Sequence, residues 1–341
     1  MQAAAFLATL LQGGSLSRSD SRQFFRLLFQ ERLPMPQARA VIALMAKNGE
    51  SAEELLGCVE ALCSLEAPLK GAIPGLVDTC GTGGDGSRSV NLSTLAALTA
   101  AGAGARIAKH GNRAITSSVG SSDLMEALGV RLEASGAVMM RAIKQCGIGY
   151  FHAPYFHPVF ARVQGLRRSL GIRTIFNLLG PLVNPVKLDG QIIGVSRKPM
   201  LNLFGRVLQA RGLRRAVIFR SVDGMDELSP FAEADCLWLE NGCLRRSRLK
   251  PSRFGFGRGR RSALSGGDLK KNRALALALL QGKSKGPLRE AVVLNAAAAL
   301  WAAGRADQFE QGLALAEASL KTGRAYEAVQ KLAAMTRNRK A

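Results

Sequence analysis

The chain has 341 residues, of which 47% are hydrophobic and 21% are charged. This composition excludes an intrinsically disordered protein and fits one large or two ordinary domains. No run approaches the roughly 18 consecutive apolar residues that a membrane-spanning helix needs, so no membrane partner is expected. The formal net charge of +22 makes attraction to polyanions, including nucleic acid, a question that the sequence raises.

The apolar start, AAAFLATLL, lacks a basic leader and a small-residue cleavage pattern. It therefore predicts a first amphipathic helix rather than a signal peptide. The six cysteines form no CxxC pair and have no histidine at zinc spacing. We expect them to be reduced thiols in a cytoplasmic protein.

The residues up to about 70 predict an all-helical domain. SLSRSDSRQFFRLLFQ begins with serine-rich capping residues and then spaces its apolar residues three and four apart. PMPQARAVIALMAKNGE predicts a second helix that is entered through prolines and ends near Gly49. Ser51 and Glu54 form a capping box that opens a third helix. No strand pattern appears in this region.

Strands and helices alternate in the rest of the chain. A short strand at 75–78 leads into a glycine-rich loop and the helix STLAALTAAGAGA, and then come the strand ARIAKHG and the helix SSDLMEALGV. QIIGVS, RAVIFRS and CLWLENGCLRRSRL are further strand candidates, and the Ala-rich tail from Gly286 predicts helix. This alternation predicts an α/β domain with a mostly parallel central sheet covered by helices.

Proline-broken helical pieces at about 150–190 are expected to complete the N-terminal domain. The predicted organisation is therefore a small helical domain, 1–70 completed by about 150–190, and a larger α/β domain, 71–149 and 191–341.

The segment Asp78–Thr94 contains a glycine-rich loop, GTGGDG, that formally matches GxGxxG. The dinucleotide-binding interpretation fails, because the helix opens about seven residues later, at Asn91 or Ser93, and no acid follows about 20 residues on. A Walker loop is excluded because no Gly-Lys-Ser/Thr follows. Glycines allow several backbone N–H groups to face one anion, and a helix N-terminus adds more donors. The segment predicts a phosphate-holding loop; the alternative is a glycine turn with an ordinary helix cap.

Two further clusters carry chemistry. Lys109–Arg113, KHGNR, leaves a strand end and is followed by TSSVGSSD, which opens a helix at Ser121 or Ser122; this predicts a second anion site, unless it is solvated basic surface. The loop DGMDE, 223–227, follows the strand RAVIFRS, and its carboxylates can hold Mg²⁺, unless they are simply loop acids. His152 and His157 are interpreted as packing or hydrogen-bonding residues rather than joint metal ligands.

Together these clusters resemble the anthranilate phosphoribosyltransferases of tryptophan biosynthesis. That family's GTGGDG, N-x-S-T, KHGNR and GS-x-D-x-x-EALG stand here in the same order and spacing. RRSLGIRTIFNLLGPLVNP, DGMDELS, SGGDLKKN and LNAAAAL also match, so the likeness covers residues from about 5 to 335. The resemblance implies a small helical domain hinged to a larger α/β domain, with homodimerisation through the small domain. It also implies that the amine of anthranilate displaces diphosphate from 5-phosphoribosyl diphosphate, with no covalent nucleophile.

The resemblance also implies the site residues. It assigns phosphoribosyl diphosphate to Gly81, Thr82, Gly83, Gly84, Asp85, Asn91, Ser93, Thr94, Lys109 and Ser121. It assigns anthranilate to Gly81, His110, Asn112, Arg167, Gly180 and Pro181, with Arg168 in place of Arg167 if the alignment shifts by one. A planar arginine fork matches the carboxylate of that substrate. Two Mg²⁺ ions are implied, one touching Ser93 and the other held by Asp226 and Glu227.

Three positions depart from the family pattern: Val90, where Phe is usual, Ser118, where Lys is frequent, and Val119, where Ser or Cys is common. The basic stretch 244–273, with eleven Lys or Arg against one Asp, keeps open a nucleic-acid-binding protein on the same scaffold. A pyrimidine-nucleoside phosphorylase of related fold is another alternative. The intact GTGGDG and KHGNR disfavour the first alternative, and DGMDELS with RRSLGIRT disfavours the second.

Overall fold

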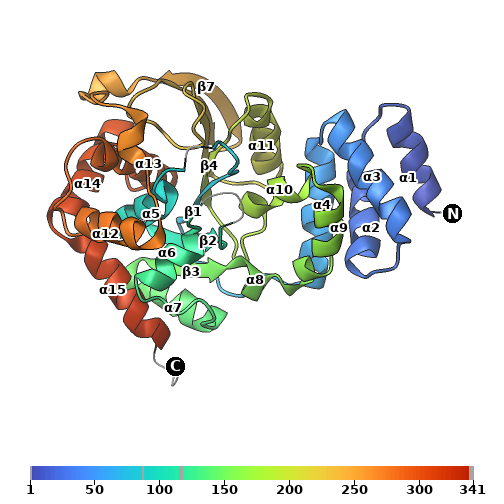
Figure 1. The fold of residues 1–341 in the computed structure, drawn as a ribbon, viewed down its shortest axis with the longest axis horizontal. Helices are drawn as coiled ribbons and strands as arrows, with labels where there is room; N and C mark the ends of the chain where they lie inside the picture. Colours follow the sequence, from blue (N-terminus) through green and yellow to red (C-terminus); the bar gives the residue numbers. More distant parts are fainter. Residues whose placement is uncertain (1, 87, 115–117, 338–341) are drawn as a thin grey trace. The chain divides into compact units, whose positions relative to one another are not determined.

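The structure is a computed structural model that describes residues 2–86, 88–114 and 118–337 (Figure 1). It contains two compact units. The helical unit comprises residues 1–69 and 154–185, and the α/β unit comprises residues 70–153 and 186–341. None of the helices within the described residues is both long and apolar enough to cross a membrane.

The helical unit begins with four helices and is completed by a later segment. Its elements are α1 (Gln2–Leu11), α2 (Arg18–Phe29), α3 (Met35–Asn48), α4 (Ala52–Leu65), α8 (Ala153–Phe156, across the boundary), η1 (Pro158–Ala161), α9 (Gln164–Leu170), α10 (Phe176–Leu179) and η2 (Gly180–Leu182). The predicted capping box is present, since Ser51 Oγ accepts from Glu54 N and Glu54 accepts from Ser51 N. Phe24, Phe25 and Phe29 of α2 are fully buried and form the aromatic centre of this unit.

The α/β unit is built on a sheet whose order among the described residues is β3-β2-β1-β4-β5-β6-β7. Strands β3, β2, β1, β4 and β5 are parallel, and β6 and β7 pair antiparallel. This confirms the mostly parallel sheet. The strands are β1 (Leu76–Gly81), β2 (Arg106–Gly111), β3 (Ile148–His152), β4 (Gly190–Gly194), β5 (Arg215–Ser221), β6 (Ala234–Glu240) and β7 (Cys243–Leu249).

Two strand predictions need correction. Residues 150–152, expected to be helical, belong to the buried strand β3. This strand begins directly after Gly147, whose left-handed conformation ends the preceding helix, and its pairing with β2 outweighs the weak local signal. CLWLENGCLRRSRL is not one strand but the hairpin β6–β7, which turns at Asn241 (φ 48°) and Gly242 (φ 82°).

Helices rich in alanine and glycine pack closely in the α/β unit. α5 (Leu92–Gly102) contacts α13 (Pro287–Ala302), α14 (Phe309–Lys321) and α15 (Arg324–Arg337), and α13 also packs on β1, β4 and β5. A Cβ at Gly102 would collide with the backbone of Ala325, so glycine permits this close approach. The other helices are α6 (Ser121–Ala127), α7 (Gly136–Cys146), α11 (Pro199–Ala210) and α12 (Leu269–Leu280), with the short turns η3 (Pro251–Phe254) and η4 (Arg261–Leu264).

The strand order has a topological switch point at β1. The chain runs from β1 outward to β2 and β3 on one side, and then restarts at β4 on the other side. Loops at the carboxyl ends of β1 and β4 therefore lead away from each other, and this is the position at which α/β sheets commonly bind ligands. The GTGGDG loop begins at that carboxyl end.

Candidate functional site

The glycine-rich loop is anchored where β1 ends. Thr82 N donates to Gly194 O at 2.9 Å, which ties the loop to the end of β4. Gly83 and Gly86 both have a φ of 66°, in the left-handed region that favours glycine. A Cβ at Gly81 would collide with the Asp226 carboxylate. The loop can adopt this conformation and approach only because it is glycine-rich.

The acid loop between β5 and β6 meets the glycine loop. Asp226 Oδ2 accepts from Gly83 N at 2.6 Å, and Asp226 N donates to Asp85 Oδ2 at 3.4 Å. Glu227 Oε1 accepts from Ser93 N at 3.1 Å, at the start of α5. The structure thus brings together two clusters that lie more than a hundred residues apart in the sequence.

Two groups hold the acid loop in this position. Ser221 Oγ donates to Glu227 O at 2.6 Å. Asn295 of α13 clamps Leu228, donating from Nδ2 to Leu228 O and accepting from Leu228 N at Oδ1, each at 3.0 Å. Asn295 is 3% exposed, so these bonds are shielded from water. The residue types alone did not reveal this role, although Asn295 stands in the matched segment LNAAAAL.

Burial makes the two adjacent carboxylates unusual acids. Asp226 is 8% exposed and Glu227 is 9% exposed. Burial, with a contribution from the charge of Asp85, raises the pKa of Asp226 to about 7. Burial and the Asp226 charge also raise the pKa of Glu227, while the ammonium of Lys109 opposes that rise. A cation at this place would relieve the repulsion.

The protein alone supplies only part of a metal coordination shell. Within the described residues, no group of three or more His, Cys, Asp or Glu side chains is arranged to hold a metal ion. This does not conflict with magnesium, which keeps several waters and is commonly held by one or two carboxylates together with substrate phosphates. The donor set of Asp226 and Glu227 fits such a shared site.

The start of α5 offers donors for an anion. Asn91 is the N-cap residue, as predicted, and Ser93 and Thr94 lie in the first turn. Thr94 Oγ1 is buried and has no hydrogen-bond partner among the described residues; the same holds for Thr82 Oγ1. Unpaired buried hydroxyls are costly in a folded protein, so both are suited to a ligand that accepts hydrogen bonds.

Lys109 is buried at the end of β2, with 3% exposure. Its Nζ donates to Thr79 O at 2.5 Å and to His110 O at 3.4 Å, so the ammonium lies at the carboxyl ends of β1 and β2. His110 N donates to Asp78 Oδ1 at 3.2 Å. Lys109 thereby places a positive charge beside the acid loop and the glycine-rich loop.

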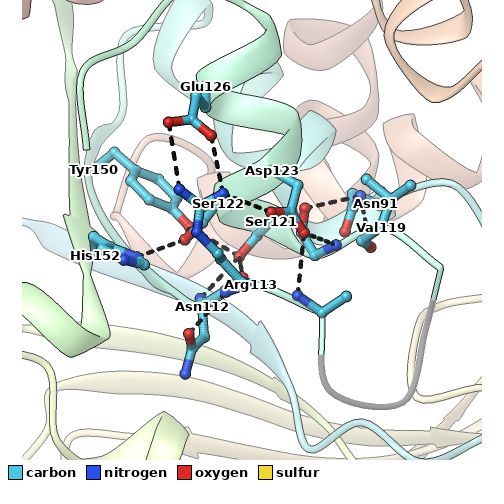
Figure 2. A network of polar contacts seen from close by, with 12 residues as sticks. Asn91, Asn112, Arg113, Val119, Ser121, Ser122, Asp123, Glu126, Tyr150 and His152 are labelled. Atoms are coloured by element: carbon cyan, nitrogen blue, oxygen red, sulfur yellow. Dashed lines mark hydrogen bonds and ion pairs between the residues drawn. The ribbon is translucent and has the colours of Figure 1, made fainter. Parts of the chain in front are cut away.

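The described residues of the second cluster are hydrogen-bonded to one another (Figure 2). Asn112 N donates to Ser121 Oγ at 3.2 Å, and Ser122 N donates to Asn112 O at 3.0 Å. Asp123 Oδ2 accepts from Gly120 N and Ala114 N. Residues Thr116 and Ser117 of the predicted turn lie outside the described residues.

The basic pentapeptide KHGNR suggested that Arg113 binds an anion from solution, but in the structure Arg113 is paired with acids of the protein. Its guanidinium contacts Asp123 and Glu126, each at 2.9 Å (Figure 2). Asn91 Nδ2 donates to Val119 O at 3.3 Å, which links this turn to the segment that follows the glycine-rich loop. The arginine therefore stabilises the turn, and the anion-binding groups of this cluster are reduced to backbone, serine and lysine donors.

The remaining predicted ligands lie in the helical unit. Arg167 of α9 is half-buried and stacks over Phe176, with 5.9 Å from its guanidinium carbon to the ring centroid. Arg168 is exposed, and Gly180 and Pro181 form the η2 turn. His157 contacts Glu66 at 2.8 Å and Val183 O at 2.5 Å, and His152 contacts Ser122, which confirms hydrogen-bonding roles for both histidines.

The positions that depart from the family pattern are accommodated by packing. Val90 is 1% exposed, and its N–H donates to Leu264 O at 2.8 Å. Ser118 Oγ donates to Gly267 O at 2.7 Å. In the basic stretch, Arg248 on β7 pairs with Asp235 and Glu233 at the edge of the sheet. Part of the positive charge is therefore balanced locally.

The fold and site define a class of two-domain glycosyl transferases. The profile described as "glycosyl transferase family, a/b domain" matches residues 74–326, and that described as "glycosyl transferase family, helical bundle domain" matches residues 4–65. The anthranilate phosphoribosyltransferase of Prochlorococcus marinus (strain MIT 9313) is 40% identical over 96% of this chain and 93% of its own length. That of Desulfosudis oleivorans is 39% identical over 97% of this chain and 98% of its own.

Solved structures of anthranilate phosphoribosyltransferases have the same fold as this chain. The crystal structure of anthranilate phosphoribosyltransferase from Thermus thermophilus matches with a TM-score of 0.91 and 37% identity, over 99% of this chain and all of that one. The Saccharomyces cerevisiae enzyme in complex with PRPP and Mg has the same fold, with a TM-score of 0.89 and 24% identity over 98% of each chain. The chain belongs to the anthranilate phosphoribosyltransferase family.

Proposed function

We propose that this protein transfers the 5-phosphoribosyl group of phosphoribosyl diphosphate to the amine of anthranilate, releasing diphosphate, as the second step of tryptophan biosynthesis. The observation that carries the proposal is the convergence at the switch point: the GTGGDG loop, the start of α5 and the buried acids of the β5–β6 loop contact one another. Relatives that align over more than nine tenths of both chains bear this activity in their names.

The chemistry needs positioning and charge stabilisation rather than a nucleophile. The bond between C1 of the ribose and the diphosphate oxygen breaks, the bond between C1 and the amine nitrogen forms, and the amine releases one proton to the solvent. Positive charge develops on the ribose and negative charge on the leaving diphosphate. Backbone N–H groups of the loop, the α5 start and the Lys109 ammonium stabilise that negative charge.

We propose the following assignment of ligands. Phosphoribosyl diphosphate is bound by Gly81, Thr82, Gly83, Gly84, Asp85, Asn91, Ser93, Thr94, Lys109 and Ser121. Two of these, Thr82 and Thr94, have hydroxyls without a hydrogen-bond partner among the described residues, which favours such a role. Gly81, His110 and Asn112 are proposed as acceptor contacts of the α/β unit. For the helical unit, Arg167 is proposed to bind the carboxylate of anthranilate, with Gly180 and Pro181 as lining residues.

Magnesium is part of the proposal, with two ions. Asp226 and Glu227 would hold one ion and Ser93 would touch the other, and the raised pKa values of the two acids support a cation at this place. The ions would neutralise the charge of the diphosphate when bound. The yeast structure named above contains Mg together with PRPP.

We further propose a homodimer formed through the helical unit, in the cytoplasm. Leu11, 69% exposed, and Met35, 40% exposed, are large apolar side chains on the surface of α1 and α3, and both would be covered in a dimer. All six cysteines are free, which fits a reducing compartment. Light scattering of the purified protein tests the dimer, because a monomer at micromolar concentration would contradict it.

The decisive experiment for the activity is a fluorescence assay. Anthranilate fluorescence should fall when phosphoribosyl diphosphate is added to the pure protein with Mg²⁺, and chelation with EDTA should stop the fall. Absence of turnover with both substrates and Mg²⁺ present would refute the proposal. A parallel reaction with a pyrimidine nucleoside and phosphate tests the phosphorylase alternative, and we expect no cleavage there.

A further inference from the structure

A run of side-chain hydrogen bonds leads from the second turn into the interior of the α/β unit (Figure 2). Tyr150 of β3 is 0% exposed, and its phenol oxygen lies 2.9 Å from Ser121 Oγ and 2.8 Å from Ser122 Oγ. Ser122 Oγ in turn lies 2.8 Å from Nδ1 of His152. The four groups therefore form one chain, from His152 through Ser122 and Tyr150 to Ser121.

The outer end of this chain is at the proposed substrate site. Ser121 Oγ accepts from Asn112 N and lies within donating distance of Asn112 O, both at 3.2 Å. A Cβ at Gly111 would collide with both Ser121 Oγ and the Tyr150 hydroxyl, so the phenol lies directly beneath the KHGNR turn. Tyr150 does not belong to any of the sequence motifs, yet it contacts a residue that is proposed to bind the substrate.

Each hydroxyl in the chain has a single hydrogen to donate, so the chain runs in one of two directions. If Nδ1 of His152 accepts from Ser122, then Tyr150 donates to Ser122 and Ser121 donates to Tyr150. If Nδ1 carries the hydrogen, Ser122 donates to Tyr150, Tyr150 donates to Ser121, and the hydrogen of Ser121 is directed away from the chain. Only the second direction leaves Ser121 a hydrogen for Asn112 O or for a ligand.

The surroundings of His152 favour the second direction. His152 lines a cavity of about 430 Å³ together with Arg113, Arg131 and Arg337, three residues whose side chains can only donate hydrogen bonds. Such donors favour a lone pair on Nε2 and hence the hydrogen on Nδ1. Burial and the charge of Arg113 lower the pKa of His152, which keeps the ring neutral.

Acids also face His152, and they do not reverse this preference. Glu126 and Asp123 of α6 are engaged by Arg113, at 2.9 Å each. Glu133, which also lines the cavity, is exposed to solvent and therefore screened. The contact between Ser121 Oγ and the acceptor Asn112 O agrees with a chain in which Ser121 donates outward.

We propose that Tyr150 and His152 are positioning residues, which fix the direction of this hydrogen-bond chain so that the hydroxyl hydrogen of Ser121, directed to Asn112 O in this structure, can turn to a phosphate of the substrate. The inference rests on the proposed function, in which Ser121 contacts phosphoribosyl diphosphate. It adds two residues that no motif contains and gives a reason for a buried tyrosine hydroxyl beneath the turn.

The first experiment measures the position of the hydrogen without using activity. The protein is labelled with ¹⁵N at its three histidines, and the resonance of His152 is assigned by its loss in His152→Phe. We expect Nδ1 to be protonated and Nε2 to be unprotonated at neutral pH in the protein without substrates. A protonated Nε2 with a bare Nδ1 would overturn the proposed direction.

The second experiment measures the consequence for the substrate. Tyr150→Phe removes one hydroxyl, and we expect the KM for phosphoribosyl diphosphate to rise about 3- to 10-fold, the scale of one hydrogen bond, with kcat nearly unchanged. Tyr155→Phe is the matched control, since Tyr155 is 45% exposed and lies outside the site; its KM should stay at the wild-type value. Ser122→Ala interrupts the same chain and serves as a second variant if Tyr150→Phe does not fold.

A double-mutant cycle shows whether Tyr150 acts through Ser121. In a Ser121→Ala background, Tyr150→Phe should cause no further rise in KM, because the hydroxyl that it orients is already absent. An unchanged KM in the single variant, or additive effects in the double variant, would overturn the inference. A wild-type protein without transferase activity would instead refute the proposed function, and the histidine measurement would still be readable.

Discussion

The two turns at the carboxyl edge of the sheet differ in whether their surroundings oppose or favour the ionised form of their carboxyl groups. Around the glycine loop, two buried carboxylates lie side by side, and burial raises the pKa of both Asp226 and Glu227. In the second turn, bonds from Gly120, Arg113 and Ala114 outweigh burial and hold the pKa of Asp123 below its usual value. In one turn burial opposes the ionisation of two neighbouring acids, whereas in the other hydrogen bonds and an ion pair favour the ionised acid.

This difference indicates different parts in binding. The described residues of the second turn satisfy one another without a ligand, so they can present a fixed surface of backbone and serine donors. The acid loop lowers the stability of the folded chain until a cation or a proton joins it, as is common where function places like charges together. The acid loop is therefore expected to govern turnover, and the second turn to govern stability.

The largest effect is expected from removing the charge of the acid loop. The double variant Asp226→Asn with Glu227→Gln keeps shape and hydrogen-bond acceptors but loses both negative charges. We expect kcat/KM to fall about 100-fold or more, the loss expected when several kcal/mol of metal-assisted charge stabilisation disappears. Steady-state kinetics by anthranilate fluorescence over a range of Mg²⁺ concentrations measures it.

The matched control changes the same residue types on β6. Asp235→Asn with Glu240→Gln removes two surface charges that pair with Arg248 and Arg215, outside the proposed site. Its activity should stay within about twofold of wild type, as for surface ion pairs in general. Equal activity of wild type and the Asp226→Asn, Glu227→Gln protein would refute the metal assignment.

A somewhat smaller effect is expected from crowding the contact between the two loops. Gly81→Ala places a methyl group against the Asp226 carboxylate, which must move away from Gly83. We expect a fall in kcat/KM of about 10- to 100-fold, because a displacement of about 1 Å in a positioning group is enough for such a loss. Gly165→Ala, where a Cβ meets nothing within 4 Å, is the control. Full activity of Gly81→Ala would contradict a functional contact between the loops.

The sequence predicted best those features that depend on residues close together in the chain. Three such features are the capping box at Ser51, the helix start at Asn91 or Ser93 and the strand RAVIFRS. The structure has all three, with Asn91 as the N-cap of α5. The motif order also predicted the family, since an ordered set of short motifs is far more specific than any single one.

The features that it missed depend on distant partners. β3 is a short segment with two glycines nearby, and only pairing with β2 makes it a strand. Arg113 looked like an anion ligand because its partners, Asp123 and Glu126, lie on the next helix and meet it only after folding. The roles of Asn295 and Tyr150 likewise arise from contacts across the unit that no local pattern encodes.

The pH dependence of stability separates the two turns further. A folded-state pKa of about 7 for Asp226 lies above its unfolded value, so its stabilising effect is present at low pH and is lost as the pH rises toward and through 7. In EDTA, Asp226→Asn should therefore gain in Tm relative to wild type between about pH 5 and about pH 8. Thermal unfolding followed by circular dichroism gives the difference. A difference that shrinks over this range would show that the carboxylate is already compensated in the folded chain.

The smallest effect is expected at Asp123, for which the pH dependence of stability has the opposite sign. Asp123→Asn weakens the bonds to Gly120 N and Ala114 N and removes the charge that faces Arg113, so we expect a loss of about 1–2 kcal/mol in stability at neutral pH. The folded-state pKa is lowered, so the stabilisation is present above the unfolded value of about 3.9 and is lost as the pH falls through the folded value. The difference in Tm from wild type should hold between about pH 7 and pH 5 and disappear in stronger acid, while kcat/KM changes by less than about threefold. The two aspartates therefore predict pH dependences of opposite sign, that of Asp226 approaching pH 7 and that of Asp123 in stronger acid, so one set of unfolding curves measures both. The same sign for both variants would show that the two turns do not differ in the way their charges are compensated.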